Sequence, residues 1–237
     1  MLKLIKLELE RNHIRTYVTA SIIIALFMLG FIYLFAYAPK LEPDDKDLQL
    51  FAGYNNLIPL FAVLNMAAFC VLSAVMYSKF IIEDYSGKRP LLLFSYPVSR
   101  KKILLSKLSV VSIFTILSLV ISDLLIFTVF GVTEKFISLV EEPFTTALVL
   151  LAVKMTIVMA FISASIGIIA VAIGFIKKSV PTTIVSAVLL SSLMCNIVAN
   201  ATLNITTLYI IALIVIIVGI LSSINLMHKV HTMEVEC

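Results

Sequence analysis

Long apolar stretches alternate with short polar connections along most of the chain. A helix needs about 20 apolar residues to cross the hydrocarbon core of a membrane, and six stretches reach that length. We predict transmembrane helices at residues 17–38, 56–80, 103–130, 146–175, 181–199 and 205–227. The pattern therefore predicts an all-α, polytopic membrane protein that forms a single transmembrane domain over residues 1–237.

The first fifteen residues carry a weaker pattern. Leu2, Ile5 and Leu9 recur at helical spacing, and charged residues lie between them. Such a segment suits an N-terminal helix lying in the cytosolic membrane interface. A simple inward extension of the first span fits this pattern equally well.

Composition supports a lipid environment. Apolar residues make up 61% of the chain and charged residues only 14%, whereas soluble domains are about 45–50% apolar. The three cysteines show no paired spacing, so neither a disulfide framework nor a metal site is predicted.

The distribution of Lys and Arg predicts the orientation. In a six-span arrangement all the basic residues fall on one side except Lys40, Lys46, Lys135 and the intramembrane Lys154. Basic residues are enriched in cytoplasmic connections. We therefore expect a multi-pass protein of the cell (plasma) membrane with both termini in the cytosol.

The connection between the second and third spans, residues 83–102, is both apolar and basic. Pro90 and Pro97 bracket a leucine-rich heptapeptide, and a proline suits the first turn of a helix but ends one that precedes it. From physics alone, this short helix either lies back into the lipid interface or protrudes to fill a groove on a cytosolic protein.

The stretch "EDYSGKRPLLLFSYPVSRKKILLSKL" at residues 83–108 resembles the permeases of the type-2 ABC exporter family. An acid at Glu83, the "SYPVSR" of residues 95–100 and Lys107 carry the likeness, which covers essentially the whole chain in length and topology. The resemblance implies a cytosolic coupling helix that docks on an ATP-binding subunit. The residues expected to make this contact are Glu83, Arg89, Leu91, Leu92, Phe94, Tyr96, Pro97 and Arg100.

The chain has no phosphate-binding loop of its own. Its only Gly-Lys pair, Gly87-Lys88, has Ile82 where the motif G-x-x-x-x-G-K-[ST] needs its first glycine. We expect no catalytic residue, no metal and no cofactor in this chain, with ATP and Mg on a partner subunit. The resemblance implies an ABC ATP-binding subunit and a second permease copy or paralogue as partners, in the lipid bilayer and without nucleic acid.

Three polar residues fall inside predicted spans. Asp123 and Lys154 lie at matching depth in neighbouring antiparallel spans, and Asn65 reaches a similar level. An isolated charge in a span costs about 2.5–3.5 kcal/mol on insertion scales, so pairing is expected. Asp123 and Lys154 either form a buried ion pair or line a polar cavity that meets the cargo.

The family resemblance predicts a permease subunit of an ATP-driven exporter. Short external loops and an aliphatic lining suit a hydrophobic or amphipathic cargo, with an antimicrobial or toxic peptide as the first hypothesis. The alternative is a secondary carrier, a channel or a membrane scaffold without ATP coupling. A carrier would more naturally show repeated, broken spans in matching positions.

Overall fold

The computed structural model describes residues 8–9, 11, 14–41, 53–86, 99–137, 145–201 and 205–232. Within these residues the protein contains helices and no strand. The long helices are α2 (Arg15–Leu41), α4 (Tyr54–Tyr77), α6 (Arg100–Ile137), α7 (Thr146–Lys177), α8 (Val180–Ala201) and α9 (Ile205–His231), and the π-helix η2 (Ser78–Ile82) continues α4. All six long helices have the length and composition to cross a membrane, so the predicted all-α polytopic fold is confirmed.

The helices extend beyond the apolar runs that predicted them. The third span was predicted at 103–130, but α6 runs over 38 residues from Arg100 to Ile137, about 57 Å at 1.5 Å per residue. The hydrocarbon core is only about 30 Å thick. Polar residues such as Thr133 and Glu134 therefore continue the helix past the apolar run, because a helix need not end where hydrocarbon ends.

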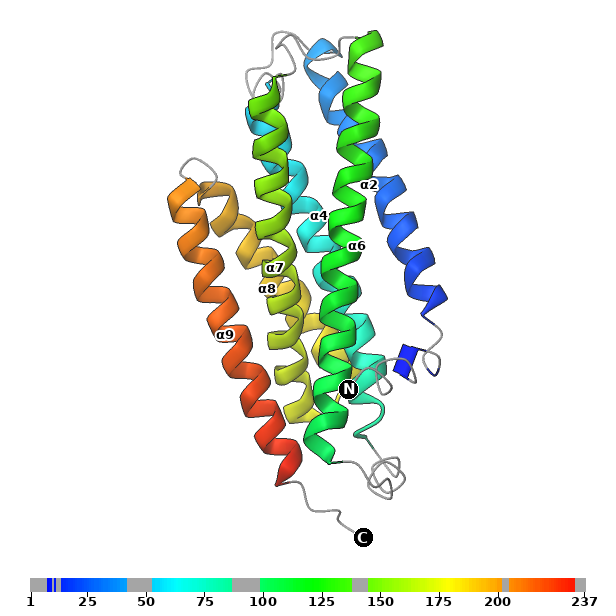
Figure 1. Ribbon diagram of the computed structural model, residues 1–237, viewed down its shortest axis with the longest axis vertical. Coiled ribbons are helices and arrows are strands. Elements are labelled where there is room, and N and C mark those ends of the chain that lie inside the picture. Colours follow the sequence, from blue (N-terminus) through cyan, green and yellow to red (C-terminus); the bar gives the residue numbers. More distant parts are fainter. Residues whose placement is uncertain are drawn as a thin grey trace.

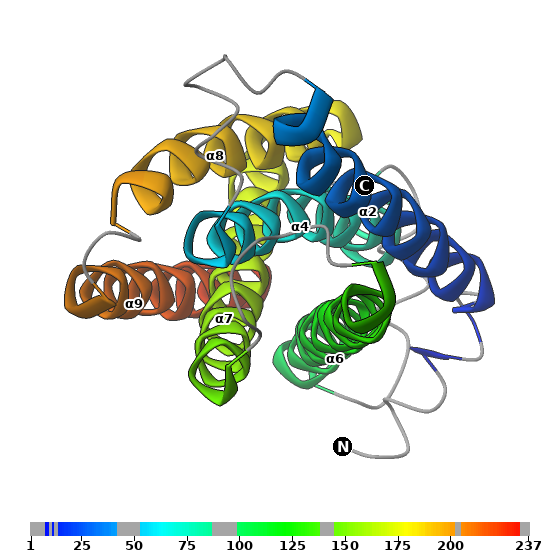
Figure 2. The same ribbon diagram turned by 90° about the horizontal axis from the view of Figure 1, so that it is seen from above.

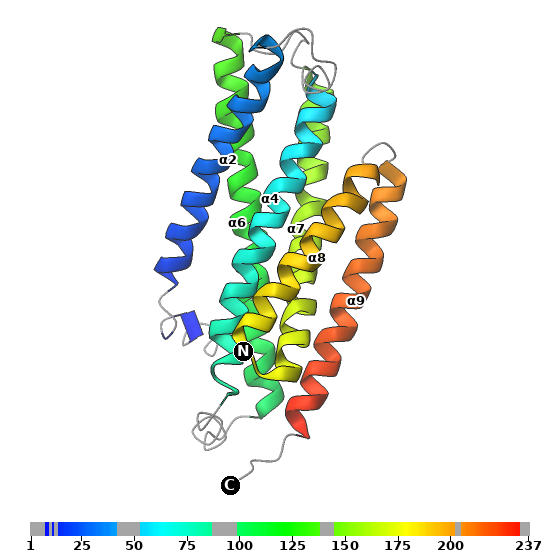
Figure 3. The same cartoon turned by 180° about the vertical axis from the view of Figure 1, so that it is seen from behind.

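Successive helices run in opposite directions (Figures 1 and 3). One end of the bundle, here called the basic end, holds the starts of α2 and α6 and the ends of α7 and α9. Arg15, Arg100, Lys177 and Lys229 lie there. The opposite end is called the far end. Viewed from above, α4 lies in the middle of the bundle, with α2, α6, α7 and α8 around it (Figure 2).

Two glycines bring α7 close to its neighbours. A Cβ added at Gly167 would lie 2.4 Å from the Ser73 hydroxyl oxygen on α4, and one added at Gly174 would lie 1.8 Å from Thr183 Oγ1 on α8. Small residues at such positions let helix backbones approach closely in membranes. The packing of α4, α7 and α8 therefore depends on these two positions.

Candidate functional site

The predicted coupling connection is described only at its two ends. Glu83 follows η2, and its carboxylate pairs with Lys79 Nζ at 2.9 Å. Arg100 begins α6 and is half-buried. The remaining predicted coupling residues lie outside the described residues: Arg89, Leu91, Leu92, Phe94, Tyr96 and Pro97. The coupling helix therefore stays a prediction.

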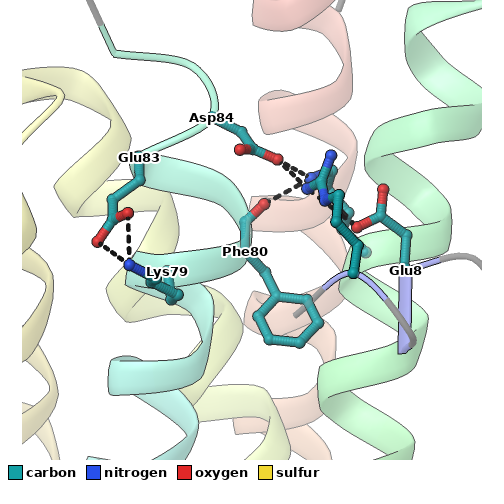
Figure 4. A network of polar contacts seen from close by, with 7 residues as sticks. Glu8, Lys79, Phe80, Glu83 and Asp84 are labelled. Carbon is teal, nitrogen blue, oxygen red and sulfur yellow. Dashed lines mark hydrogen bonds and ion pairs between the residues drawn. The ribbon is translucent and has the colours of Figure 1, made fainter. Parts of the chain in front are cut away.

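Beside these two ends, charged side chains surround the buried ammonium of Lys107 (Figure 4). The Lys107 side chain is 0% exposed, and its Nζ donates to the Phe80 carbonyl at 2.7 Å and to the Asp84 carboxylate. Glu8 Oε2 lies 3.5 Å from the same ammonium. Arg11 pairs with Asp84 and also with Glu8, the latter at 3.1 Å. We call Glu8, Arg11, Asp84 and Lys107 the ionic cluster.

The π-helix shapes one wall of the ionic cluster. The Glu83 amide bonds to the Ser78 carbonyl, five residues back, at 3.0 Å. A π-turn widens a helix locally and is frequent at functional sites. Phe80 lies in the middle of this turn and presents its carbonyl to Lys107. Buried ammonium groups need such acceptors, because an unpaired buried charge is costly.

The segment after η2 is packed as well as paired. Tyr85 is buried and makes an edge contact with Phe175 of α7, with ring centroids 5.6 Å apart. Burial raises the pKa of the Tyr85 phenol above its ordinary value, as do the Asp84 and Glu8 carboxylates, so the phenol stays neutral. Ser86 Oγ donates to the Lys178 carbonyl at 3.2 Å. The start of the connection 83–102 is therefore fixed to the end of α7 and to the turn between α7 and α8.

The ionic cluster joins three parts of the chain that are distant in sequence. Glu8 and Arg11 come from the N-terminal segment, Asp84 follows η2, and Lys107 belongs to α6. Leu9 packs against the same core, and the rest of the predicted interfacial helix largely precedes the described residues. Salt bridges across the three segments therefore join parts of the chain that the helix order alone does not bring together.

The sequence singled out Glu83 as a coupling residue and predicted no partner for Lys107. Lys107 was noted only as part of the family pattern, whereas the structure brings Asp84 to it. The available signal was a lysine within an apolar helix, which needs a counter-charge. The two neighbouring acids cannot be told apart without knowing how the π-turn rotates them.

A second polar group lies deeper in the bundle. Asp123 of α6 is 2% exposed. Asn65 Nδ2 on α4 donates to its Oδ1 at 2.6 Å, and Thr156 Oγ1 on α7 donates to its Oδ2 at 2.9 Å. The structure thus brings together two of the three predicted intramembrane residues and adds Thr156.

Lys154 is not part of this group. It lies on the exposed face of α7, and no ion pair joins it to Asp123. The expectation of a buried Asp123–Lys154 pair is therefore corrected. Matching depth does not ensure contact, because successive residues of a helix point about 100° apart. The rotation of α7 turns Thr156, two residues later, towards Asp123 instead.

An apolar cavity of about 280 Å³ lies between α4, α6 and α7 in the half of the bundle nearer the far end. Its walls include Leu57 of α4, Phe127 of α6 and Ala152 of α7. Thr156 also lines it, so the hydroxyl that bonds Asp123 forms a polar point on an otherwise mostly apolar wall. The cavity has the size and lining to accept an apolar group.

The chemistry of the two sites is that of positioning and binding. Among the residues that the structure describes, no group of three or more His, Cys, Asp and Glu side chains could hold a metal ion. The ionic cluster holds segments together through charge, and the cavity offers a mostly apolar surface with a few hydroxyl-bearing residues, Thr156 among them.

Comparisons with known proteins point to one family. The model of the family described as ABC-2 family transporter protein matches residues 4–192. The chain is similar to "Uncharacterized protein YcbO" of Bacillus subtilis (strain 168), with 28% identity over 196 residues, 82% of this chain and 84% of that protein. No solved structure matches the chain. The match includes the ionic cluster and the cavity.

Proposed function

Because this chain belongs to the ABC-2 transporter family as a multi-pass permease subunit, we propose that it exports a hydrophobic or amphipathic cargo, driven by a separate ATP-binding subunit. The family implies such a partner and a membrane. The proposal adds the direction of transport, the coupling route and the class of cargo. A second copy or a paralogue completes the transport pathway in this proposal.

The ionic cluster is the observation that carries the coupling route. Asp84 lies at one end of the connection 83–102, and Lys107 lies in the second turn of the helix that follows its other end. A displacement of the connection would therefore act on α4 and α6 together. The N-terminal segment would move with them through Glu8 and Arg11.

The cavity supports the class of cargo. Its wall is formed mainly by aliphatic and aromatic side chains, with Thr156 as a hydrogen-bonding point. An apolar group of a lipid or of an amphipathic peptide would match this surface better than a sugar or an ion would. An amphipathic, toxic or antimicrobial peptide remains the first hypothesis for the whole cargo.

Co-purification tests the coupling route. We expect the chain to purify with an ABC ATP-binding subunit, and the double variant Leu92→Asp with Phe94→Asp to lose it. The control Thr232→Asp adds negative charge at the same basic end, on an exposed residue after α9, and should keep the subunit. Retention of the subunit by the double variant would refute the route.

Transport itself needs a separate measurement. Inverted membrane vesicles that contain both subunits should accumulate a fluorescent amphipathic cationic peptide or an acyl-chain lipid analogue when ATP is supplied. Accumulation that ignores ATP and follows an ion gradient would instead identify a secondary carrier. Uptake in the opposite vesicle orientation would refute the export direction.

A further inference from the structure

A groove of about 200 Å³ runs between α7 and α9 near the basic end. The two helices lie side by side there (Figures 1 and 2). The α7 wall is apolar and includes Ile173 and Ile176. The α9 wall is polar and carries Ser222, Asn225 and Lys229. The groove thus pairs a hydrocarbon surface with a row of hydrogen-bonding groups.

The polar row follows one face of α9. Ser222, Asn225 and Lys229 are spaced i, i+3 and i+7, which places them on the same helix face. They cover about 10 Å along the helix axis. Within the described part of the chain, the side chains of these three residues make no hydrogen bond and no ion pair. Polar groups left without partners in hydrocarbon are costly, so a ligand that supplies acceptors would be favoured.

Charge indicates which ligand. Lys177 ends α7 and Lys178 follows it, at the same end of the bundle where α9 ends after Lys229. Neither α7 nor α9 contains an Asp or a Glu. Basic pockets between transmembrane helices at the cytoplasmic side bind anionic lipid headgroups. Lys229 is the charged residue among those that line the groove, and it is a cation, so the groove favours an anion over a zwitterion.

We propose that this groove binds one anionic phospholipid. An acyl chain lies along the α7 isoleucines, and the phosphate accepts hydrogen bonds from Lys229 Nζ and the Asn225 amide. Just before the groove begins, α7 and α9 are in tight contact. A Cβ added at Gly219 of α9 would lie 3.1 Å from Ser165 Cβ of α7. Ser222 comes one turn after that contact. The proposal does not depend on the transported cargo or on ATP coupling.

Native mass spectrometry of the full chain in detergent tests the site. With phosphatidylglycerol added, we expect one tightly retained lipid, and with phosphatidylcholine none. Lys229→Gln should weaken retention of phosphatidylglycerol about five-fold, the effect of losing about 1 kcal/mol from one basic residue. Lys229→Gln with Asn225→Leu should weaken it further.

The matched control is Lys154→Gln, which removes an exposed lysine from α7 away from the groove. This variant should retain phosphatidylglycerol like the unaltered protein. Equal retention by the Lys229 and Lys154 variants would overturn the proposal, and so would equal retention of phosphatidylcholine.

Two further arms separate other occupants. Glycerol phosphate carries the headgroup chemistry without acyl chains, and we expect no displacement of the lipid at equal concentration. Displacement by glycerol phosphate would show a soluble phosphate site and overturn the lipid proposal.

Cysteine placed at Ile173 should not cross-link two copies of the chain. Efficient cross-linking there would show that a second copy covers the groove.

Discussion

The two ends of the bundle handle buried charge in different ways. At the basic end, Lys107 is fully buried among carboxylates and a backbone carbonyl, and the four charges of the ionic cluster sum to zero. Towards the far end, Asp123 is equally buried but is met by two neutral donors, Asn65 and Thr156. One site compensates charge with charge, and the other uses hydrogen bonds alone.

This difference teaches what each region can do. Ion pairs between three segments tie those segments together, as the proposed coupling route requires. Asp123 with its two neutral donors fixes three helices at one level, and an apolar cavity opens beside Thr156. The basic end therefore ties three segments together, whereas the half nearer the far end leaves space for an apolar group.

Removing the buried ammonium should have the largest effect. Lys107→Met leaves Asp84 and Glu8 with Arg11 as their cationic partner within the ionic cluster, and breaking a buried ion pair costs about 3–5 kcal/mol. The free energy of unfolding, measured by SDS titration of the purified protein in detergent micelles, should fall by that amount. Lys154→Met removes an exposed lysine and should change it little.

A second substitution distinguishes the charge from the packing. Adding Asp84→Leu to Lys107→Met removes the uncompensated carboxylate and leaves the Glu8–Arg11 pair, so part of the lost stability should return. An identical loss in the single and double variants would show that the ionic cluster is not a coupled unit.

The Asp123 site should respond to loss of its acceptors more than to loss of charge. Asp123→Leu leaves the Asn65 amide and the Thr156 hydroxyl without this partner, and we expect a loss of about 1–3 kcal/mol in unfolding free energy. Asp123→Asn keeps an oxygen and should cost clearly less. If the two variants lose equal stability, the carboxylate charge itself is required.

The exchange Asp123→Lys with Lys154→Asp extends the same test. The two side chains are not in contact, so the exchanged pair should be no more stable than Asp123→Lys alone. Rescue by the exchange would show that residues 123 and 154 do form an ion pair, contrary to the structure.

Filling the cavity should separate binding from stability. Ala152→Leu projects a larger apolar side chain into the space between α4, α6 and α7. Lipid tails are as apolar as leucine, so the gain from burial is small in a membrane, and we expect a stability change under about 1 kcal/mol. Binding of a fluorescent acyl-chain probe should nevertheless be lost.

The same change at Ala147 provides the control, because Ala147 is an exposed residue of α7 outside the cavity. Probe binding should persist in Ala147→Leu. Equal probe binding by both variants would show that the probe does not bind in the cavity, and the cavity would then no longer support the proposed class of cargo.

The fold could be predicted from the sequence because lipid leaves few choices. A spanning segment must satisfy its own backbone hydrogen bonds, so an apolar run of sufficient length becomes a helix. All six predicted spans are helices. In α6 the C-terminal end was predicted too early, because Thr133 and Glu134 continue the helix beyond the apolar run.

The contacts could be predicted only in part, because they depend on helix rotation. Depth along the membrane follows from counting residues, and Asn65 and Asp123 do meet. The side of α7 that faces α6 depends on packing at positions such as Gly167 and Gly174, so Lys154 was assigned the wrong partner. The π-turn of η2, which precedes Asp84, could not be predicted from the sequence, and neither could the contact of Asp84 with Lys107.

The smallest effect should come from Glu83, the acid beside Asp84. The side chains of Lys79 and Glu83 are 55% and 31% exposed, and they form an i, i+4 pair. Exposed helix pairs of this kind contribute about 0.3–0.5 kcal/mol and are weakened by salt. Glu83→Gln should therefore change unfolding free energy by no more than that, and the change should vanish at 1 M salt.

Asp84→Asn should cost several-fold more and keep most of its effect in salt, because its partner Lys107 is buried. If Glu83→Gln instead matched Asp84→Asn, the distinction between a surface pair and the ionic cluster would fail, whereas loss of ATPase co-purification in a stable Glu83→Gln protein would place Glu83 at the partner interface.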